Sequence, residues 1–200
     1  LVEKPLSTHS DEGTEIVNAS HSHGVQVAVG YQTRFLPQSE IIREIVQDEV
    51  FGPVQRFAYQ FGSLGKWAPV SGYNLSRSSA GGGVMTGNGS HFMDRLISWF
   101  GYPDEIRCED DSRGGPESNA LAHFSFKGFD PPIRGTARFS RTVSMKSGIV
   151  IETERGVVTA LDGRSTPVVF HPQDQPHLQF DVSRPDRELP PGLIEADVQL

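Results

Sequence analysis

A glycine-rich run in the middle of the chain leads into a segment that carries an imidazole and a carboxylate. Residues 81–89 are rich in glycine, and His91 and Asp94 follow them. Apolar residues at helical spacing predict a helix over residues 92–100, which Gly101 would end. His91 and Asp94 are three positions apart, so a helix places them on one face. An imidazole beside a carboxylate exchanges a proton near neutral pH, which indicates a proton-transfer site reached through a flexible loop. The alternative is a glycine-rich turn with a capping histidine.

A lysine at the start of the chain is the second candidate. The chain opens with Leu-Val-Glu-Lys-Pro-Leu-Ser, and Pro5 restricts Lys4 to an extended conformation. At the carboxyl end of a strand in an open α/β sheet, the Lys4 ammonium would lie in the ligand crevice. The alternative is an exposed surface lysine.

Further polar and aromatic side chains suit a polyol or a sugar. Arg34 lies in a Tyr-x-x-Arg-x-x-Pro run, where we expect it to end a strand. Aromatic rings stack on sugar faces, and Asn and Arg bind hydroxyl groups. The irregular segment before the glycine run supplies such side chains, namely Trp67, Tyr73, Asn74 and Arg77. The alternative is a polar loop with one anchoring aromatic residue.

These three motifs, taken together and in this order, resemble the Gfo/Idh/MocA oxidoreductase family over roughly residues 1–110. The resemblance implies an N-terminal Rossmann domain that binds NAD or NADP, and a second domain on an open sheet that carries the substrate. The expected site residues are Lys4 and His91 for catalysis, Asn88, Asp94, Trp67 and Arg77 for the substrate, and Glu3, Lys4, Pro5 and Arg34 for the cofactor.

One position departs from the family pattern. Related proteins commonly carry an Asp four residues before this His, whereas this chain has Gly87. The departure puts the efficiency or the catalytic role of His91 in doubt. Asp94 could partly replace the missing carboxylate, or Asn88 could hydrogen-bond the substrate.

Composition excludes several classes of function. The 200 residues carry a net charge of −7, which argues against nucleic acid or an anionic membrane as partner. No apolar run approaches the ~20 residues of a membrane helix. Cys108 is the single cysteine, which excludes an internal disulfide and fits a cytoplasmic or otherwise reducing location. His21 and His23 have no carboxylate or third histidine nearby, so we predict no metal site.

The predicted elements divide the chain in two. Residues 1–52 are expected to be the remnant of a Rossmann domain. Its expected elements are a helix over 10–20 with Ile16 and Val17 facing inward, a buried parallel strand over 25–30 and a helix from Pro37. Residues 53–200 change to a period of two. Expected strands there are 106–110, 120–126, 135–141, 149–154, 157–161 and 168–171, with a hairpin tip at Arg155-Gly156.

The expected fold is therefore α+β: an open, mainly antiparallel sheet with a covering helix, preceded by a partial Rossmann unit. No Gly-x-Gly-x-x-Gly fingerprint is present, and the periodic segment 193–200 ends without a cap, so the chain is expected to be a fragment that is incomplete at both ends. Apolar strands would make the uncovered sheet face apolar, and a second copy would cover it in a homo-oligomer.

The leading prediction is the substrate-binding part of an NAD(P)-dependent oxidoreductase that transfers a hydride from a sugar, a polyol or a derivative, and that is inactive as a fragment. One alternative is a non-catalytic ligand sensor or assembly scaffold of the same fold, which the loss of the carboxylate at Gly87 would suit. A redox-neutral lyase or glycosidase that uses NAD within one turnover is the other.

Overall fold

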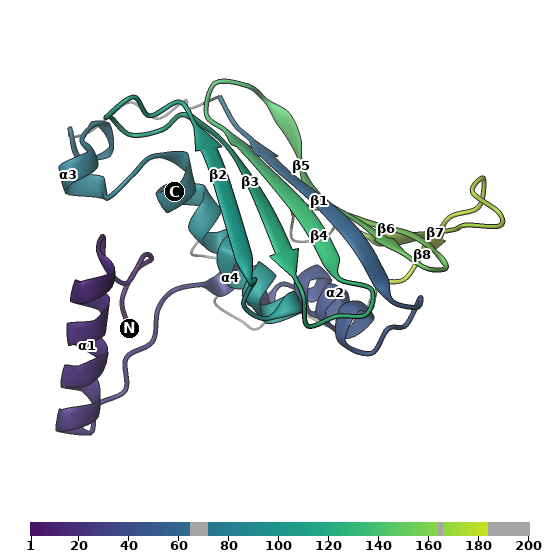
Figure 1. Cartoon of the computed structure of the whole chain (residues 1–200), viewed down its shortest axis with the longest axis horizontal. Helices are drawn as coiled ribbons and strands as arrows, with labels where there is room; N and C mark the ends of the chain where they lie inside the picture. Colours follow the sequence, from purple (N-terminus) through teal and green to yellow (C-terminus); the bar gives the residue numbers. More distant parts are fainter. Residues whose placement is uncertain (65–71, 164–165, 184–200) are drawn as a thin grey trace.

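An open mixed sheet forms the body of the molecule, and helices cover one of its faces (Figure 1). The computed structural model describes residues 1–64, 72–163 and 166–183. The strands lie in the order β2-β3-β4-β1-β5-β6-β7-β8. Neighbours are antiparallel except β1 and β4, which are parallel. The fold is α+β with an open, mainly antiparallel sheet, as predicted.

The strands agree with the sequence periodicity to within a few residues. They are β1 (Val54–Gly62), β2 (Glu105–Asp110), β3 (Asn119–Phe126), β4 (Ile133–Ser140), β5 (Met145–Thr153), β6 (Gly156–Leu161), β7 (Val168–Pro172) and β8 (Phe180–Asp181). The short strand β8 was not predicted. The hairpin tip lies one residue earlier than expected, because Gly156 already pairs with Thr153.

The helices are α1 (Ser10–His23), α2 (Pro37–Gln47), α3 (Arg77–Ala80) and α4 (Ser90–Phe100), with short helical turns η1 (Gln32–Phe35), η2 (Tyr73–Leu75) and η3 (Met85–Gly89). Among the residues that the structure describes, no helix has both the length and the apolar character needed to cross a membrane. The α4 helix ends at Gly101, whose φ of 79° lies in the region that favours glycine.

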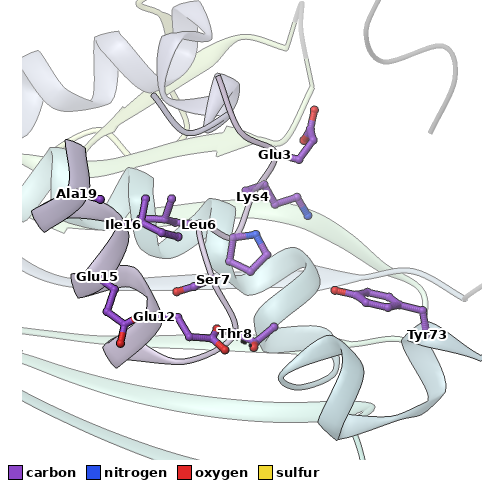
Figure 2. A pocket seen from close by; sticks show the side chains of 11 residues that line it. Glu3, Lys4, Leu6, Ser7, Thr8, Glu12, Glu15, Ile16, Ala19 and Tyr73 are labelled. Atoms are coloured by element: carbon purple, nitrogen blue, oxygen red, sulfur yellow. Dashed lines mark hydrogen bonds between the residues drawn. The ribbon is translucent and has the colours of Figure 1, made fainter. Parts of the chain in front are cut away.

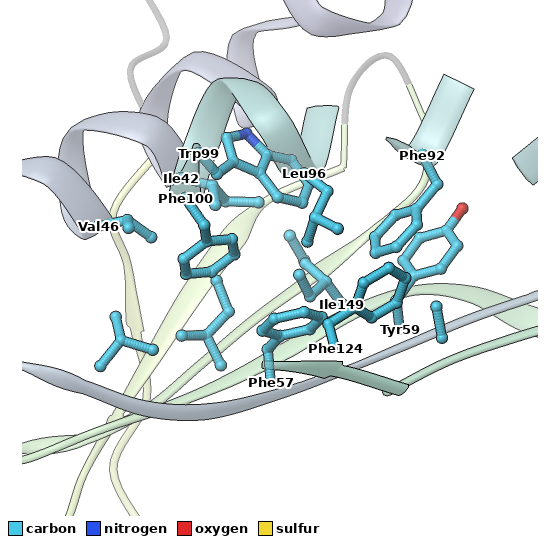
Figure 3. Packing of buried hydrophobic residues seen from close by; sticks show 14 of the residues in the cluster. Ile42, Val46, Phe57, Tyr59, Phe92, Leu96, Trp99, Phe100, Phe124 and Ile149 are labelled. Carbon is cyan, nitrogen blue, oxygen red and sulfur yellow. The ribbon is translucent and has the colours of Figure 1, made fainter. Parts of the chain in front are cut away.

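An aromatic core joins α2 and α4 to the sheet (Figure 3). The rings of Tyr59 and Phe92 stack with centroids 4.0 Å apart, and those of Phe57 and Phe100 with centroids 5.0 Å apart. The indole of Trp99 donates a hydrogen bond of 2.9 Å to the carbonyl of Ser39 and so ties α4 to α2. This burial fixes the helix on which His91 and Asp94 were predicted to lie.

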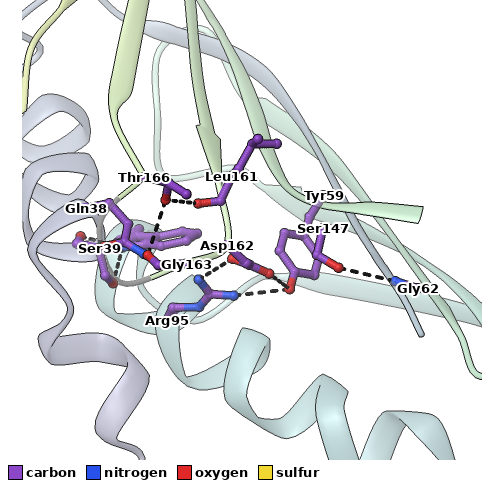
Figure 4. Close-up of polar contacts among 11 residues, drawn as sticks. Gln38, Ser39, Tyr59, Gly62, Arg95, Ser147, Leu161, Asp162, Gly163 and Thr166 are labelled. Carbon is purple, nitrogen blue, oxygen red and sulfur yellow. Dashed lines mark hydrogen bonds and ion pairs between the residues drawn. The ribbon is translucent and has the colours of Figure 1, made fainter. Parts of the chain in front are cut away.

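A buried polar cluster also holds α4 on the sheet (Figure 4). Arg95 donates to a carboxylate oxygen of Asp162 at 2.8 Å and to the hydroxyl of Tyr59 at 3.2 Å. Tyr59 in turn donates to the other carboxylate oxygen of Asp162 at 2.5 Å. Burial, followed by the charge of Asp162, raises the pKa of Tyr59. Each of the three side chains therefore has a polar partner, and the buried Nε of Arg95 is the one nitrogen of its guanidinium without one.

The first thirty residues differ from their prediction. The α1 helix has no buried residue, Val17 is 42% exposed, and residues 25–28 are exposed. A single parallel bridge, between Val2 and Val29, replaces the predicted buried strand. An apolar run becomes buried when strands flank it on both sides, and here it has one neighbour. Figure 1 shows α1 lying apart from the sheet.

The uncovered sheet face is not the apolar surface that was predicted. Alternation along β1 and β4 turns Arg56, Arg134 and Arg138 away from the helices, and Arg56 lies directly beside Arg134 in the parallel register. Arg56 forms an ion pair of 2.6 Å with Glu152 on β5. The aromatic residues of β1 are instead on the covered face. Homo-oligomerisation through this face stays a prediction, and the face is mixed, because Val150 and Leu161 are also exposed.

Candidate active site

The second half of the glycine-rich run is a helical turn, where a loop was predicted. Residues 85–89 form a π-helical turn that continues directly into α4. The glycines permit a close approach of neighbouring groups: a β-carbon on Gly83 would lie 1.9 Å from the carbonyl oxygen of Glu117, and one on Gly82 would lie 2.3 Å from the hydroxyl of Thr86. The glycines therefore let the chain pack on itself at this turn.

Glu117 holds this turn and was missed by sequence reasoning. Its buried carboxylate accepts hydrogen bonds from the backbone N–H of Gly83 at 2.8 Å and of Met85 at 2.9 Å. Its carbonyl accepts from Val84 at 2.9 Å. Glu117 lies in the connection between β2 and β3, and no sequence pattern relates it to the turn. A buried carboxylate that binds backbone amides fixes the turn that leads to His91.

Lys4 contacts the same turn. Its ammonium donates a hydrogen bond of 2.6 Å to the carbonyl of Gly87, 83 positions away in the sequence. Lys4 lies in a bend and not at the end of an extended strand, so that detail of the prediction is wrong. The side chain reaches the turn because the first bridge, between Val2 and Val29, brings the start of the chain to α4. The structure thus places Lys4 beside the glycine run.

The environment of Lys4 changes its proton affinity. Burial lowers the pKa of the Lys4 ammonium, the carboxylate of Glu3 raises it, and the guanidinium of Arg141 lowers it again. The net result is a pKa below the usual value of 10.5. A lysine with a lowered pKa gives up its proton more readily than a surface lysine.

We expect two substitutions to move the pKa of Lys4 in opposite directions. Arg141→Gln removes a repelling cation and raises it, whereas Glu3→Gln removes an attracting anion and lowers it. NMR titration of the labelled lysine ammonium groups measures both shifts, with the exposed Lys127 as an internal control. Shifts of the same sign in the two variants would contradict this account of the charges.

Asp94 is hydrogen-bonded to Arg34, which the sequence analysis expected at the end of a strand. Arg34 lies in η1 and not at a strand end, because the chain forms a 3₁₀ turn there before Pro37 begins α2. The Arg34 Nε donates to one carboxylate oxygen of Asp94 at 2.7 Å, and its Nη2 donates to the other at 2.5 Å. This bidentate pair fixes the carboxylate that was predicted to orient His91.

His91 lies in the first turn of α4, where its half-buried ring meets the ring of Tyr31 edge to face, with centroids 6.0 Å apart. Burial, and then the charge of Asp94, raises the pKa of Tyr31. Tyr31 therefore keeps its hydroxyl proton across the physiological range. It belongs to the motif that contains Arg34, but sequence reasoning did not identify it as a site residue.

Two clefts lie on either side of the segment 5–8. The first, of about 710 Å³, lies between this segment and α1, and Figure 2 shows the Tyr73 ring reaching toward it from η2. The second, of about 570 Å³, lies against the start of α4. Its lining includes the predicted residues Pro5, Arg34 and Asp94 together with Tyr31, Thr86, Ser90 and Tyr102. Glu3 and Lys4 line the first cleft.

The remaining predicted residues divide into three groups. Asn88 lies half-buried in the turn η3, next to the contact between Lys4 and Gly87. Arg77 is exposed at the start of α3 and lines neither cleft. Trp67 and the segment 193–200 lie outside the residues that the structure describes.

No protein-family model and no curated protein matches the sequence. Solved structures do share the fold. The aldose-aldose oxidoreductase of Caulobacter crescentus, solved with glycerol, has a TM-score of 0.78 at 16% identity, over 94% of this chain and 56% of its own. Levoglucosan dehydrogenase, solved with NADH and levoglucosan, has a TM-score of 0.75 at 15% identity, over 92% of this chain and 53% of its own.

An NAD-binding oxidoreductase of Klebsiella pneumoniae has a TM-score of 0.73 at 16% identity, over 90% of this chain and 52% of its own. The chain therefore spans about half the length of these proteins and shares the architecture of that half. At this level of identity the likeness establishes the fold.

Proposed function

We propose that this chain is the substrate-binding part of an NAD(P)-dependent oxidoreductase that acts on a sugar, a polyol or a derivative by hydride transfer. The observation that carries the proposal is the hydrogen bond of 2.6 Å from Lys4 to Gly87, which joins two distant predicted motifs at one turn before His91. The sugar-related structures that share the fold support the same substrate class. Residues 1–52 would belong to a dinucleotide-binding domain and residues 53–200 to the substrate domain.

The cofactor would be NAD or NADP, with its nicotinamide end at the second cleft. The mixture of aromatic and polar side chains there, including Tyr31 and Arg34, suits a flat, polar ring. The proposed contacts are Pro5 and Arg34, which line this cleft, together with Glu3 and Lys4, which line the first cleft. We assign no residue to the pyrophosphate, because the sequence contains no glycine fingerprint before a helix. When bound, the cofactor supplies a hydride acceptor.

In this proposal the residues of the chain bind the substrate and move its hydroxyl proton. Lys4 donates a hydrogen bond to the reacting oxygen and stabilises negative charge there. His91 accepts the hydroxyl proton as general base. Asn88 and Asp94 orient the remaining hydroxyl groups, and the pair with Arg34 holds the Asp94 carboxylate in place.

A non-catalytic ligand sensor or scaffold is the second candidate function. Two observations favour it: Gly87 supplies no carboxylate, and the carboxylate of Asp94 already binds Arg34 at both oxygens. A site of this kind would bind a sugar without a general base whose orientation is fixed.

In the enzyme that contains this chain, Lys4→Ala should lower turnover on the order of 10²-fold or more while NAD affinity changes little. Lysine acts at the reacting oxygen, whereas most cofactor contacts lie elsewhere. Absorbance of the reduced nicotinamide with a panel of polyols and sugars measures turnover, and calorimetry measures NAD affinity. Lys127→Ala, at an exposed lysine, is the matched control. Unchanged turnover with a large loss of NAD affinity would overturn the assigned role.

A further inference from the structure

A second cation lies at the turn that Lys4 contacts. Arg141 follows β4, and its backbone N–H donates to the carbonyl of Ser118 at 2.9 Å. Its guanidinium Nη2 donates to the carbonyl of Gly83 at 3.2 Å. A β-carbon built on Gly87 would lie 2.5 Å from this same Nη2. The guanidinium therefore occupies the space that a side chain at position 87 would take.

The two cations share one backbone turn. The Gly87 N–H donates to the Gly83 carbonyl at 2.9 Å, so Lys4 and Arg141 bind carbonyls one helical turn apart. Burial is the main cause of the lowered pKa of Lys4, and repulsion from Arg141 lowers it further. The turn thus concentrates positive charge in a chain whose net charge is −7.

The acidic side chains around this turn neutralise its charge only in part: the Glu3 carboxylate attracts the Lys4 ammonium without forming an ion pair with it. Both oxygens of Glu117 accept backbone N–H groups, and both oxygens of Asp94 bind Arg34. Within residues 1–64, 72–163 and 166–183, no carboxylate lies within ion-pair distance of Lys4 or Arg141. A glycine at position 87 keeps a further carboxylate away. Half-buried cations that form no ion pair attract an anion from solution, and Arg141 is the one of the two on which no carboxylate of this turn acts in the described contacts.

We propose that Arg141 is a specificity residue that selects an anionic sugar derivative, through hydrogen bonds from its guanidinium to a carboxylate or phosphate group. A guanidinium presents paired donors that match the oxygens of these anions. One of its donors is used by Gly83, and the rest of the fork stays available for a ligand among the described contacts. The proposal rests on the proposed function only in taking the ligand to be a sugar.

Binding measurements on this chain test the proposal. The probes are D-glucuronate, D-glucose 6-phosphate and uncharged D-glucose, and the observables are the amide NMR shifts of Gly83 and Gly87. We expect at least one anion to bind about tenfold more tightly than glucose. Arg141→Gln should remove this preference, and Arg141→Lys, which keeps the charge but not the fork, should keep part of it. Arg138→Gln, on the uncovered face of the preceding strand β4, should leave it intact.

The comparison between the two anions identifies the preferred group, carboxylate or phosphate. The proposal is overturned if neither anion binds better than glucose, or if the preference survives in a folded Arg141→Gln variant. Oxidation of a neutral polyol with no preference for anions would overturn this inference and leave the proposed function standing. In the enzyme that contains this chain, Arg141-dependent binding of an anion without any nicotinamide reduction would overturn the proposed function and leave this inference standing.

Discussion

Replacing His91 by alanine is expected to lower turnover of the true substrate by about 10²–10⁴-fold, the usual cost of a lost acid–base group. His91 lies in the first turn of α4, where the aromatic core and the Tyr31 ring hold it in place. An alcohol that loses a hydride must also lose its hydroxyl proton, and an imidazole is the side chain suited to accept it near neutral pH. The measurement is the pH–rate profile of the parent and of His91→Ala.

Two further variants make the His91 result specific. His91→Gln keeps a polar side chain but no base, so it should lose the pH-dependent limb together with the rate. His123→Ala, at an exposed position on β3, should retain both. Activity that is indifferent to His91 would favour the sensor or scaffold function over the enzyme.

Position 87 offers a related comparison. The sequence alone suggests that Gly87→Asp would restore a partner for His91. In the structure a β-carbon at this position meets the guanidinium of Arg141 at 2.5 Å. The new carboxylate would therefore pair with Arg141 before it could orient His91. We therefore expect Gly87→Asp to give no gain in activity on an anionic substrate.

The sheet and the helix under it were predictable because their signals are local. The alternation of Phe57 and Tyr59 with Arg56 and Ala58 fixes which face of β1 is buried, and the core confirms it. Apolar spacing likewise predicted α4 and its end at Gly101. Periodicity reports which face of an element is apolar, which is sufficient for elements that pack on a single core.

Sequence periodicity did not predict the contacts between segments that are distant in the chain. The apolar run 25–30 looks buried, but burial depends on how many strands flank it, and the sequence does not encode that number locally. Family resemblance, and not spacing, assigned Lys4 and His91 to one site, and the hydrogen bond from Lys4 to Gly87 was not predicted. Arg34 was expected near a ligand, yet its pairing with Asp94 needs the position of η1 against α4.

Glu117 is the clearest omission, and its removal carries the largest expected effect on stability. Glu117→Ala should lower the free energy of unfolding by about 3 kcal/mol or more, because two backbone amides each lose a bond to a charged group worth about 1.5–3 kcal/mol. The amide of Gly83 is buried, so water replaces the lost acceptor poorly. Urea unfolding measures the change.

A comparison of the stabilities of Glu117→Gln and Glu117→Ala distinguishes the contribution of hydrogen bonding from that of packing. Glu117→Gln keeps the volume and one acceptor oxygen, but turns an amide NH₂ toward a backbone N–H, so its stability should fall between those of the parent and Glu117→Ala. Glu109→Ala, at an exposed acid on β2, should change stability by no more than about 0.5 kcal/mol.

Since Glu117 fixes the turn whose carbonyl binds Lys4, the Glu117→Gln variant should also raise the pKa of Lys4 as the ammonium becomes more exposed. Equal stability of Glu117→Gln and the parent would show that the carboxylate does not hold this turn.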